Sequence, residues 1–257
     1  MNTRLLYENL IDLSGVTIAA SSEGSDLPAS NVAHPFPSRV WRTGTSTAAE
    51  WVKFDLGSAK AVGAVVIYNH DLTGSDTLIR LQGNSSDSWD TPAVSITLVW
   101  AEDVIKYFLP AAQTYRYWRV TFTKSASGET RDVGRIYLGP VVVLDEDPDY
   151  DNYQVEYVDL SESEEALGGQ LWTDERGEYR RVQFAYDGAF QSTIDAVFAA
   201  YLAVKMGTPF FVNLYPDLSN DLYYVVFRAE PSCKVRAWDP DEGWVKTLKA
   251  DLRELVT

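Results

Sequence analysis

The stretch Trp51–Gly57 (WVKFDLG), with the apolar run that follows it, constrains the fold more than any other part of the chain. That run, Ala61–Tyr68, is rich in β-branched residues, and residues 58–60 separate the two segments as a short turn. Two short apolar segments joined by a turn predict two strands of one sheet. In Tyr117–Phe122 polar and apolar side chains alternate, which predicts a further strand with one apolar face.

Large side chains in and near these segments are expected to fill a core, because aromatic rings carry the largest apolar areas. Gly57 is expected to end the first strand. The side chains assigned to the core are those of Trp41, Trp51, Phe54, Leu56 and Trp118.

The order of these motifs resembles the discoidin family, also called the coagulation-factor C-type or galactose-binding-like domain. The resemblance rests on Trp51–Gly57 and on the later segment Arg116–Phe122, which reads R-Y-W-R-V-T-F. Three further segments fit the same order: Ala29–Asn31, Trp41–Arg42 and Arg135–Gly139. The resemblance covers roughly Leu5 to Pro140. It implies a jelly-roll β-sandwich whose end loops bind a ligand, often a glycan, and it implies no catalysis.

The composition limits the partners. At 257 residues the chain is long enough for one large domain or two ordinary ones. Its formal net charge is −15, so its surface repels phosphates. We therefore expect no direct nucleic-acid binding, and partners that are either neutral, such as sugars, or proteins.

Cys233 is the only cysteine, so no intrachain disulfide can form. Discoidin domains of secreted animal proteins usually close with a disulfide, and this departure points to folding in a reducing cytosol. The first residues contain no apolar core of signal-peptide length, and no run reaches the ~18 apolar residues that span a membrane. We therefore expect a protein made in a cytoplasm without a signal peptide, with no membrane partner, as suits a virion component released by lysis.

Residues 1–142 are expected to form the discoidin-like domain and residues 143–257 a second domain. Between Asp145 and Glu165 the sequence holds ten acidic residues. This acidic segment is interpreted as a solvated linker, and the alternative is a docking face for a basic neighbour.

Residues 192–206 are predicted to form a helix, with Ser192 or Thr193 as its cap and Gly207 as its stop. Its expected apolar stripe consists of Ile194, Val197, Phe198, Tyr201 and Leu202. The surrounding segments read as strands, so the predicted class is mainly β: a jelly-roll β-sandwich, then a β-sandwich or split barrel with one flanking α-helix.

This second half resembles the tail-tube-like domain of tailed-phage structural proteins. The segments that carry the resemblance are Arg180–Tyr186, the helix, Gly207–Phe211 and Trp244–Glu254. The resemblance implies assembly into rings around the tail channel.

Arg39, His70, Asp71 and Trp89 are the candidate ligand-binding residues. An aromatic ring packs on the apolar side of a sugar, and charged or polar groups bind its hydroxyls. Each residue also has a structural alternative. In these alternatives Arg39 forms an ion pair with an acidic residue, His70 caps a turn, and Trp89 packs under its own loop.

Carboxylates that could bind calcium, as some discoidin-like domains do, are Asp71, Asp76, Asp87 and Asp90. No other cofactor is expected. The two histidines, His34 and His70, lie in no recognisable catalytic arrangement, and no G-x-S-x-G or H-E-x-x-H motif occurs. We therefore expect no catalytic residue and no enzyme.

The two resemblances together predict a phage virion structural protein of the tail tip or baseplate. Its second domain would form a homo-oligomeric ring with other tail proteins, and its first domain would contact a host-surface glycan. The alternative is a free-standing lectin or carbohydrate-binding module with an accessory β domain.

Overall fold

The computed structural model describes residues 2–45, 49–74, 78–123, 128–148, 150–215, 221–239 and 243–255. These residues form antiparallel strands with a single α-helix, α1 (Gln191–Val204), so the predicted mainly-β class is confirmed. No helix in this part of the chain is long and apolar enough to cross a membrane.

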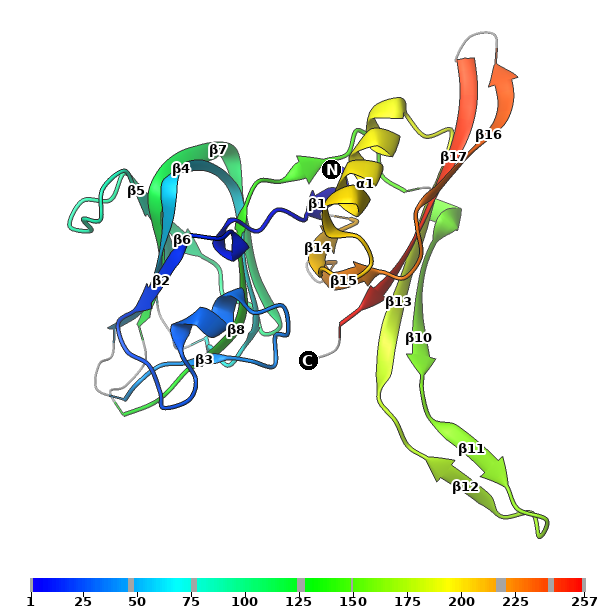
Figure 1. Cartoon of the computed structure of the whole chain (residues 1–257), viewed down its shortest axis with the longest axis horizontal. Coiled ribbons are helices and arrows are strands. Elements are labelled where there is room, and N and C mark those ends of the chain that lie inside the picture. The colour runs from blue at the N-terminus through cyan, green and yellow to red at the C-terminus, as the bar shows by residue number, and fades with distance from the viewer. Residues whose placement is uncertain are drawn as a thin grey trace. The chain divides into compact units, whose positions relative to one another are not determined.

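The chain folds as two compact units. Glu8–Val141 forms one, here called the sandwich unit, and Met1–Tyr7 with Val142–Val256 forms the other, here called the helix-bearing unit. The first seven residues thus depart from the expected division, because β1 (Arg4–Leu6) hydrogen-bonds into the sheet of the helix-bearing unit (Figure 1).

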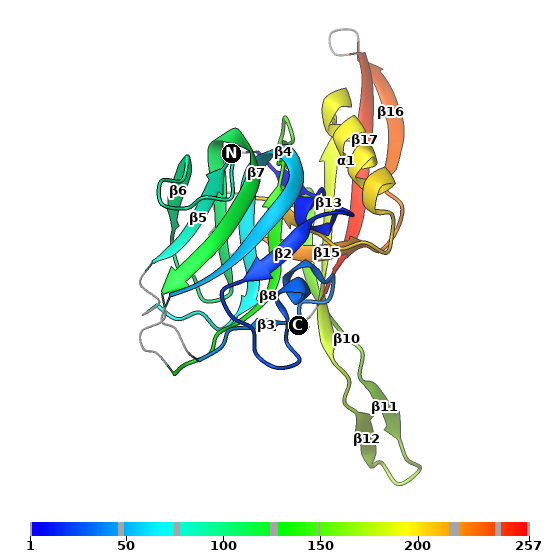
Figure 2. The same ribbon diagram turned by 60° about the vertical axis from the view of Figure 1, so that its left-hand side comes forward.

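The sandwich unit is built on two long curved strands, β4 (Ala49–His70) and β7 (Val104–Thr123), which run antiparallel side by side (Figure 2). The first half of β4 pairs with β2, and its second half pairs with β8. The strands therefore form two layers around one apolar core. The other elements of this unit are η1 (Leu10–Asp12), β2 (Thr17–Ala20), η2 (Ala29–Ala33), β3 (Trp41–Arg42), β5 (Ile79–Asn84), β6 (Val94–Leu98) and β8 (Asp132–Gly139).

The predicted turn at residues 58–60 is a bend inside β4, so the prediction that Gly57 ends the strand is wrong. The pairing of β4 with β7 shifts register between Asp55 and Lys60, and Gly57 has a φ of +74°. A bulge with a left-handed glycine increases the local twist, and this lets one strand pass from one layer to the other.

Trp41 and Trp118 are fully buried, as predicted, but Trp51 is not part of the core. In β4 the buried positions alternate as Val52, Phe54 and Leu56, and Trp51 lies half-buried on the opposite face. Side chains three positions apart in a strand point to opposite faces, so Trp51 and Phe54 cannot share one core.

The helix-bearing unit is one eight-stranded sheet, ordered β10-β13-β17-β15-β14-β1-β9 with β16 paired to β17, and a separate hairpin, β11–β12. Its elements besides β1 and α1 are β9 (Val142–Val143), η3 (Tyr150–Asn152), β10 (Tyr153–Asp159), β11 (Glu162–Glu165), β12 (Leu171–Asp174), β13 (Glu178–Asp187), β14 (Phe210–Asn213), β15 (Tyr223–Phe227), β16 (Ser232–Asp239) and β17 (Gly243–Glu254).

The core of this unit forms where α1 packs against one face of the sheet. Ile194 and Val197 of α1 contribute to it, as predicted, whereas Leu202 is exposed. Leu5 of β1 belongs to the same core, although it lies at the other end of the chain from α1.

Helix α1 begins and ends earlier than the predicted range 192–206. Phe190 occupies the N-cap position, so Ser192 and Thr193 lie inside the first turn and the predicted cap is wrong. Lys205 has a φ of +54° and ends the helix before Gly207 is reached. A residue with a positive φ cannot continue a right-handed helix, whether or not it is a glycine.

Candidate ligand-binding site

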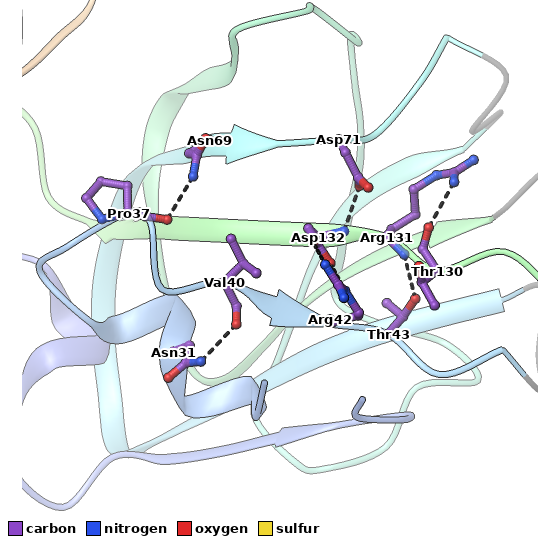
Figure 3. A network of polar contacts seen from close by, with 10 residues as sticks. All are labelled: Asn31, Pro37, Val40, Arg42, Thr43, Asn69, Asp71, Thr130, Arg131 and Asp132. Carbon is purple, nitrogen blue, oxygen red and sulfur yellow. Dashed lines mark hydrogen bonds and ion pairs between the residues drawn. The ribbon is translucent and has the colours of Figure 1, made fainter. Parts of the chain in front are cut away.

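One end of the sandwich unit collects several loops, here called the loop end: residues 34–43, 69–74, 99–103 and 128–132. Figure 3 shows side chains from the first, second and fourth of these loops. The strand register places them together. Val133 at the start of β8 pairs with both Trp41 and His70, and Tyr68 near the end of β4 pairs with Val104 at the start of β7.

An ion pair stands at the centre of the loop end. The carboxylate of Asp132 accepts hydrogen bonds from Nε and Nη2 of Arg42 at 2.7 and 2.6 Å. The backbone N–H of Asp132 donates to Oδ1 of Asp71 at 2.6 Å, and the N–H of Asp71 donates to the carbonyl of Asp132 at 3.1 Å. A bidentate arginine–carboxylate pair is geometrically specific, so these contacts hold three charged groups in one arrangement.

The pair lies at the surface, since the Arg42 side chain is 45% exposed. Hydrogen bonding to Asp132, and then the charge of that carboxylate, raise the pKa of Arg42. The guanidinium is therefore a permanent cation at neutral pH.

A second arginine, Arg131, holds the chain next to Asp132 through several hydrogen bonds. Arg131 is nearly buried, and its N–H donates to the hydroxyl of Thr43 at 2.9 Å. Its guanidinium donates to the carbonyl of Thr130 at 2.9 Å and to Glu129 at 2.7 Å. These bonds fix the chain on both sides of the Arg42–Asp132 pair (Figure 3).

Two loops cross β8 at Gly134 without room for a side chain. Nδ2 of Asn69 donates to the carbonyl of Pro37 at 2.8 Å. A Cβ atom on Gly134 would lie 2.4 Å from the carbonyl oxygen of Pro37 and 3.0 Å from that of Asn69.

We expect Gly134→Ala to lower the free energy of unfolding of the sandwich unit by about 1–3 kcal/mol, because the backbone of both loops must move to relieve the overlap. Urea unfolding followed by circular dichroism measures this loss. Gly128→Ala is the comparison. An alanine there would have a strained backbone, because φ is +103°, but its Cβ atom would meet nothing within 4 Å. A Gly134→Ala protein as stable as the parent would contradict the close approach.

Aromatic rings are also exposed at the loop end. Nε1 of Trp100 donates to the carbonyl of Leu72 at 2.8 Å, and its ring, 39% exposed, packs beside Gly74. Trp100 therefore packs against the loop that holds Asp71. Phe36 is exposed as well and contacts the ring of His34.

The surroundings of His34 favour its neutral form. Burial, followed by the positive charge of Arg39, lowers the pKa of His34. Its Nδ1 accepts the N–H of Phe36 at 3.1 Å, which only an unprotonated nitrogen can do.

The structure brings three of the four sequence-predicted residues to this end. Asp71 lies in the central network, and Arg39 is exposed on the neighbouring loop. His70 reaches the loop end too, but its ring nitrogens are shielded from solvent and are not presented to a ligand.

Trp89 lies elsewhere, so the four residues do not form one site. Its loop follows Asn84, which pairs with Tyr117 beside the bend in β4, at the far end of the strands from Ile79. Nε1 of Trp89 donates to Asp87 at 2.7 Å, and the guanidinium of Arg119 stacks 4.5 Å from its ring centre. This arrangement matches the structural alternative for Trp89.

The calcium candidates that the structure describes are separated in the same way, so they do not share one site. Asp71 is at the loop end, whereas Asp87 pairs with Lys53 near the bend at 2.6 Å and Asp90 belongs to the same loop as Asp87. Asp76 falls outside the described residues. In the described part of the chain, no three His, Cys, Asp or Glu side chains come close enough together to hold a metal ion.

Sequence reasoning missed Arg42, Asp132 and Trp100 as site residues. Arg42 and Asp132 are 90 positions apart, and no local pattern joins them.

No family model matches the chain, and no curated protein matches it. Solved structures similar to part of it include a Streptococcus pneumoniae fucose-binding module, with 15% identity, a TM-score of 0.43, and coverage of 52% of this chain and 95% of that chain. Another is chitosan-binding module 1 from a Paenibacillus chitosanase/glucanase, with 20% identity, a TM-score of 0.42, and coverage of 52% and 99%. A third is the lectin domain of lectinolysin with Lewis B antigen, with 15% identity, a TM-score of 0.42, and coverage of 51% and 95%.

Proposed function

We propose that the sandwich unit is a carbohydrate-binding module and that its loop end binds the glycan. The observation that carries this proposal is the exposed, rigidly held Arg42–Asp132 pair, with Asp71 bonded to it and Trp100 hydrogen-bonded to Leu72 on the loop of Asp71. Fucose, chitosan and a Lewis antigen are ligands that the names of the solved structures above mention, and the proposal adopts that class.

The chemistry suits a sugar. Arg42 uses two of the five N–H donors of a guanidinium for Asp132, and three donors remain on a side chain that is 45% exposed. Donors and acceptors side by side can bind two neighbouring hydroxyls, while an indole ring packs on the apolar side of the sugar. Neutral sugars also avoid the repulsion that a chain of net charge −15 imposes on anions.

We expect the whole chain to bind selected oligosaccharides on a glycan array and Arg42→Gln to weaken that binding at least about tenfold, or about 1.4 kcal/mol. Calorimetry with the best array ligand measures the change. Arg116→Gln is the matched control, because Arg116 forms an equally exposed bidentate pair with Asp55 at 2.7 and 2.8 Å, but near the bend of β4.

Both substitutions remove a surface ion pair, so both should change stability little, by about 0–1 kcal/mol. An array without any bound glycan would contradict the proposed function. Equal weakening of binding by Arg42→Gln and Arg116→Gln would contradict the proposed site.

A tail-tip or baseplate role stays a prediction from the sequence resemblance, as do the virion location and the partnership with other tail proteins. The solved structures described above are binding modules and do not bear on that role. Genes for tail proteins beside the gene for this chain would favour the tail-tip or baseplate role. For the sandwich unit we propose binding without catalysis.

A further inference from the structure

The helix-bearing unit carries two hairpins that extend from opposite ends of one long ribbon of sheet (Figure 1). Residues 160–177, which contain β11 and β12, are here called the acidic arm. Residues 232–249, which contain β16 and the first half of β17, are here called the basic hairpin.

The acidic arm has no neighbour that stabilises it. In the described part of the chain, β11 and β12 pair only with each other, and every residue from Glu162 to Glu178 is exposed. An isolated two-stranded hairpin is marginally stable at best in water. The arm nevertheless exposes Leu167, Leu171 and Trp172, which is typical of a segment that is covered in an assembly.

The charge of the arm is strongly negative. Arg176 is its only cation, and it bonds to Glu162 and Asp174 within the arm. The carboxylates of the arm are those of Glu162, Glu164, Glu165, Asp174 and Glu175.

The basic hairpin has the opposite character. Val235, Trp238 and Trp244 are between 58% and 61% exposed, and the two indole rings contact each other with centres 4.9 Å apart. The register pairs Trp238 with Trp244 and Val235 with Lys246, which places these side chains on one face. Lys234 and Lys249 lie on the other face of the stem, since they pair with Thr247 and Ser232, and Arg236 bonds to Asp187 at 2.9 Å. The acidic residues of the segment are confined to positions 239–242.

We propose that the acidic arm of one copy of this chain binds the basic hairpin of a second copy. The two surfaces combine exposed aromatic and aliphatic side chains with opposite charges, in a chain whose net charge of −15 otherwise opposes self-association. Because the hairpins extend from opposite ends of one ribbon, the contact joins different surfaces of two copies and is heterologous.

The test uses the full-length chain and two charge-swapped variants. The first is Lys234→Glu with Lys246→Glu, and the second is Glu164→Lys with Glu165→Lys; Glu162 is left alone because it bonds to Arg176. Sedimentation velocity measures association, and circular dichroism confirms that each variant is folded. We expect the parent chain to self-associate and each variant alone to associate at least about tenfold more weakly.

Mixing the two variants should restore association, because each altered hairpin then meets an altered arm of opposite charge and each native hairpin meets a native arm. One chain that carries all four substitutions should also self-associate. Rising salt should weaken association, since screening reduces the attraction between exposed charges. A parent chain that is monomeric at low salt and high concentration, or a mixture that fails to restore association, would overturn the proposal.

Discussion

Trp118→Ala is expected to lower the free energy of unfolding of the sandwich unit by about 3–5 kcal/mol, the usual cost of deleting a buried aromatic side chain. Trp118 is fully buried, and its Nε1 donates to the carbonyl of Tyr115 at 3.2 Å. A Cβ atom on the facing Gly83 would lie 2.9 Å from its ring. The indole is thus tightly packed against the neighbouring strand. Removing the indole leaves a cavity.

Trp51→Ala is the comparison, with an expected loss of about 1 kcal/mol, because this ring is half-buried on the outer face of β4. Urea unfolding followed by far-ultraviolet circular dichroism reports both losses without depending on tryptophan fluorescence. Similar, large losses for the two variants would show that the outer face of β4 is covered and that the assignment of faces is wrong.

Removing residues 1–7 is expected to unfold the helix-bearing unit and to leave the sandwich unit folded. β1 pairs on one side with β14 and on the other with β9, and Leu5 and Leu6 are buried in this arrangement. Losing a buried leucine costs about 2–5 kcal/mol, so losing two is comparable to the whole stability of a typical domain, about 5–15 kcal/mol.

Calorimetry of the full chain and of the chain without residues 1–7 measures this, and residues 8–141 alone should still unfold cooperatively. A peptide of residues 1–7 should restore the missing transition by adding back the strand. The same peptide with Leu6→Asp should not, because it would bury an unpaired charge. An unchanged transition in the shortened chain would show that β1 is dispensable.

Local patterns predicted a large part of the fold. Alternation identified the second half of β7, and the spacing of Ile194 and Val197 identified α1. Such patterns succeed because the side-chain period of a strand or helix depends on neighbouring residues. The same rule contradicts a core position for Trp51, since Phe54 stands three positions away on the same strand.

What the sequence by itself determined is therefore the class of structure: which segments become strands, which one becomes a helix, and which rings, such as Trp118, are large enough to need a core. Only the tertiary structure decided that β1 completes the sheet of the other unit, that Arg42 meets Asp132, and that Trp89 lies far from Asp71. These outcomes depend on the register between strands that are distant in sequence. A one-residue shift of register moves every side chain to the other face. The pattern of one segment shows which face is buried, but not which distant strand lies beside it.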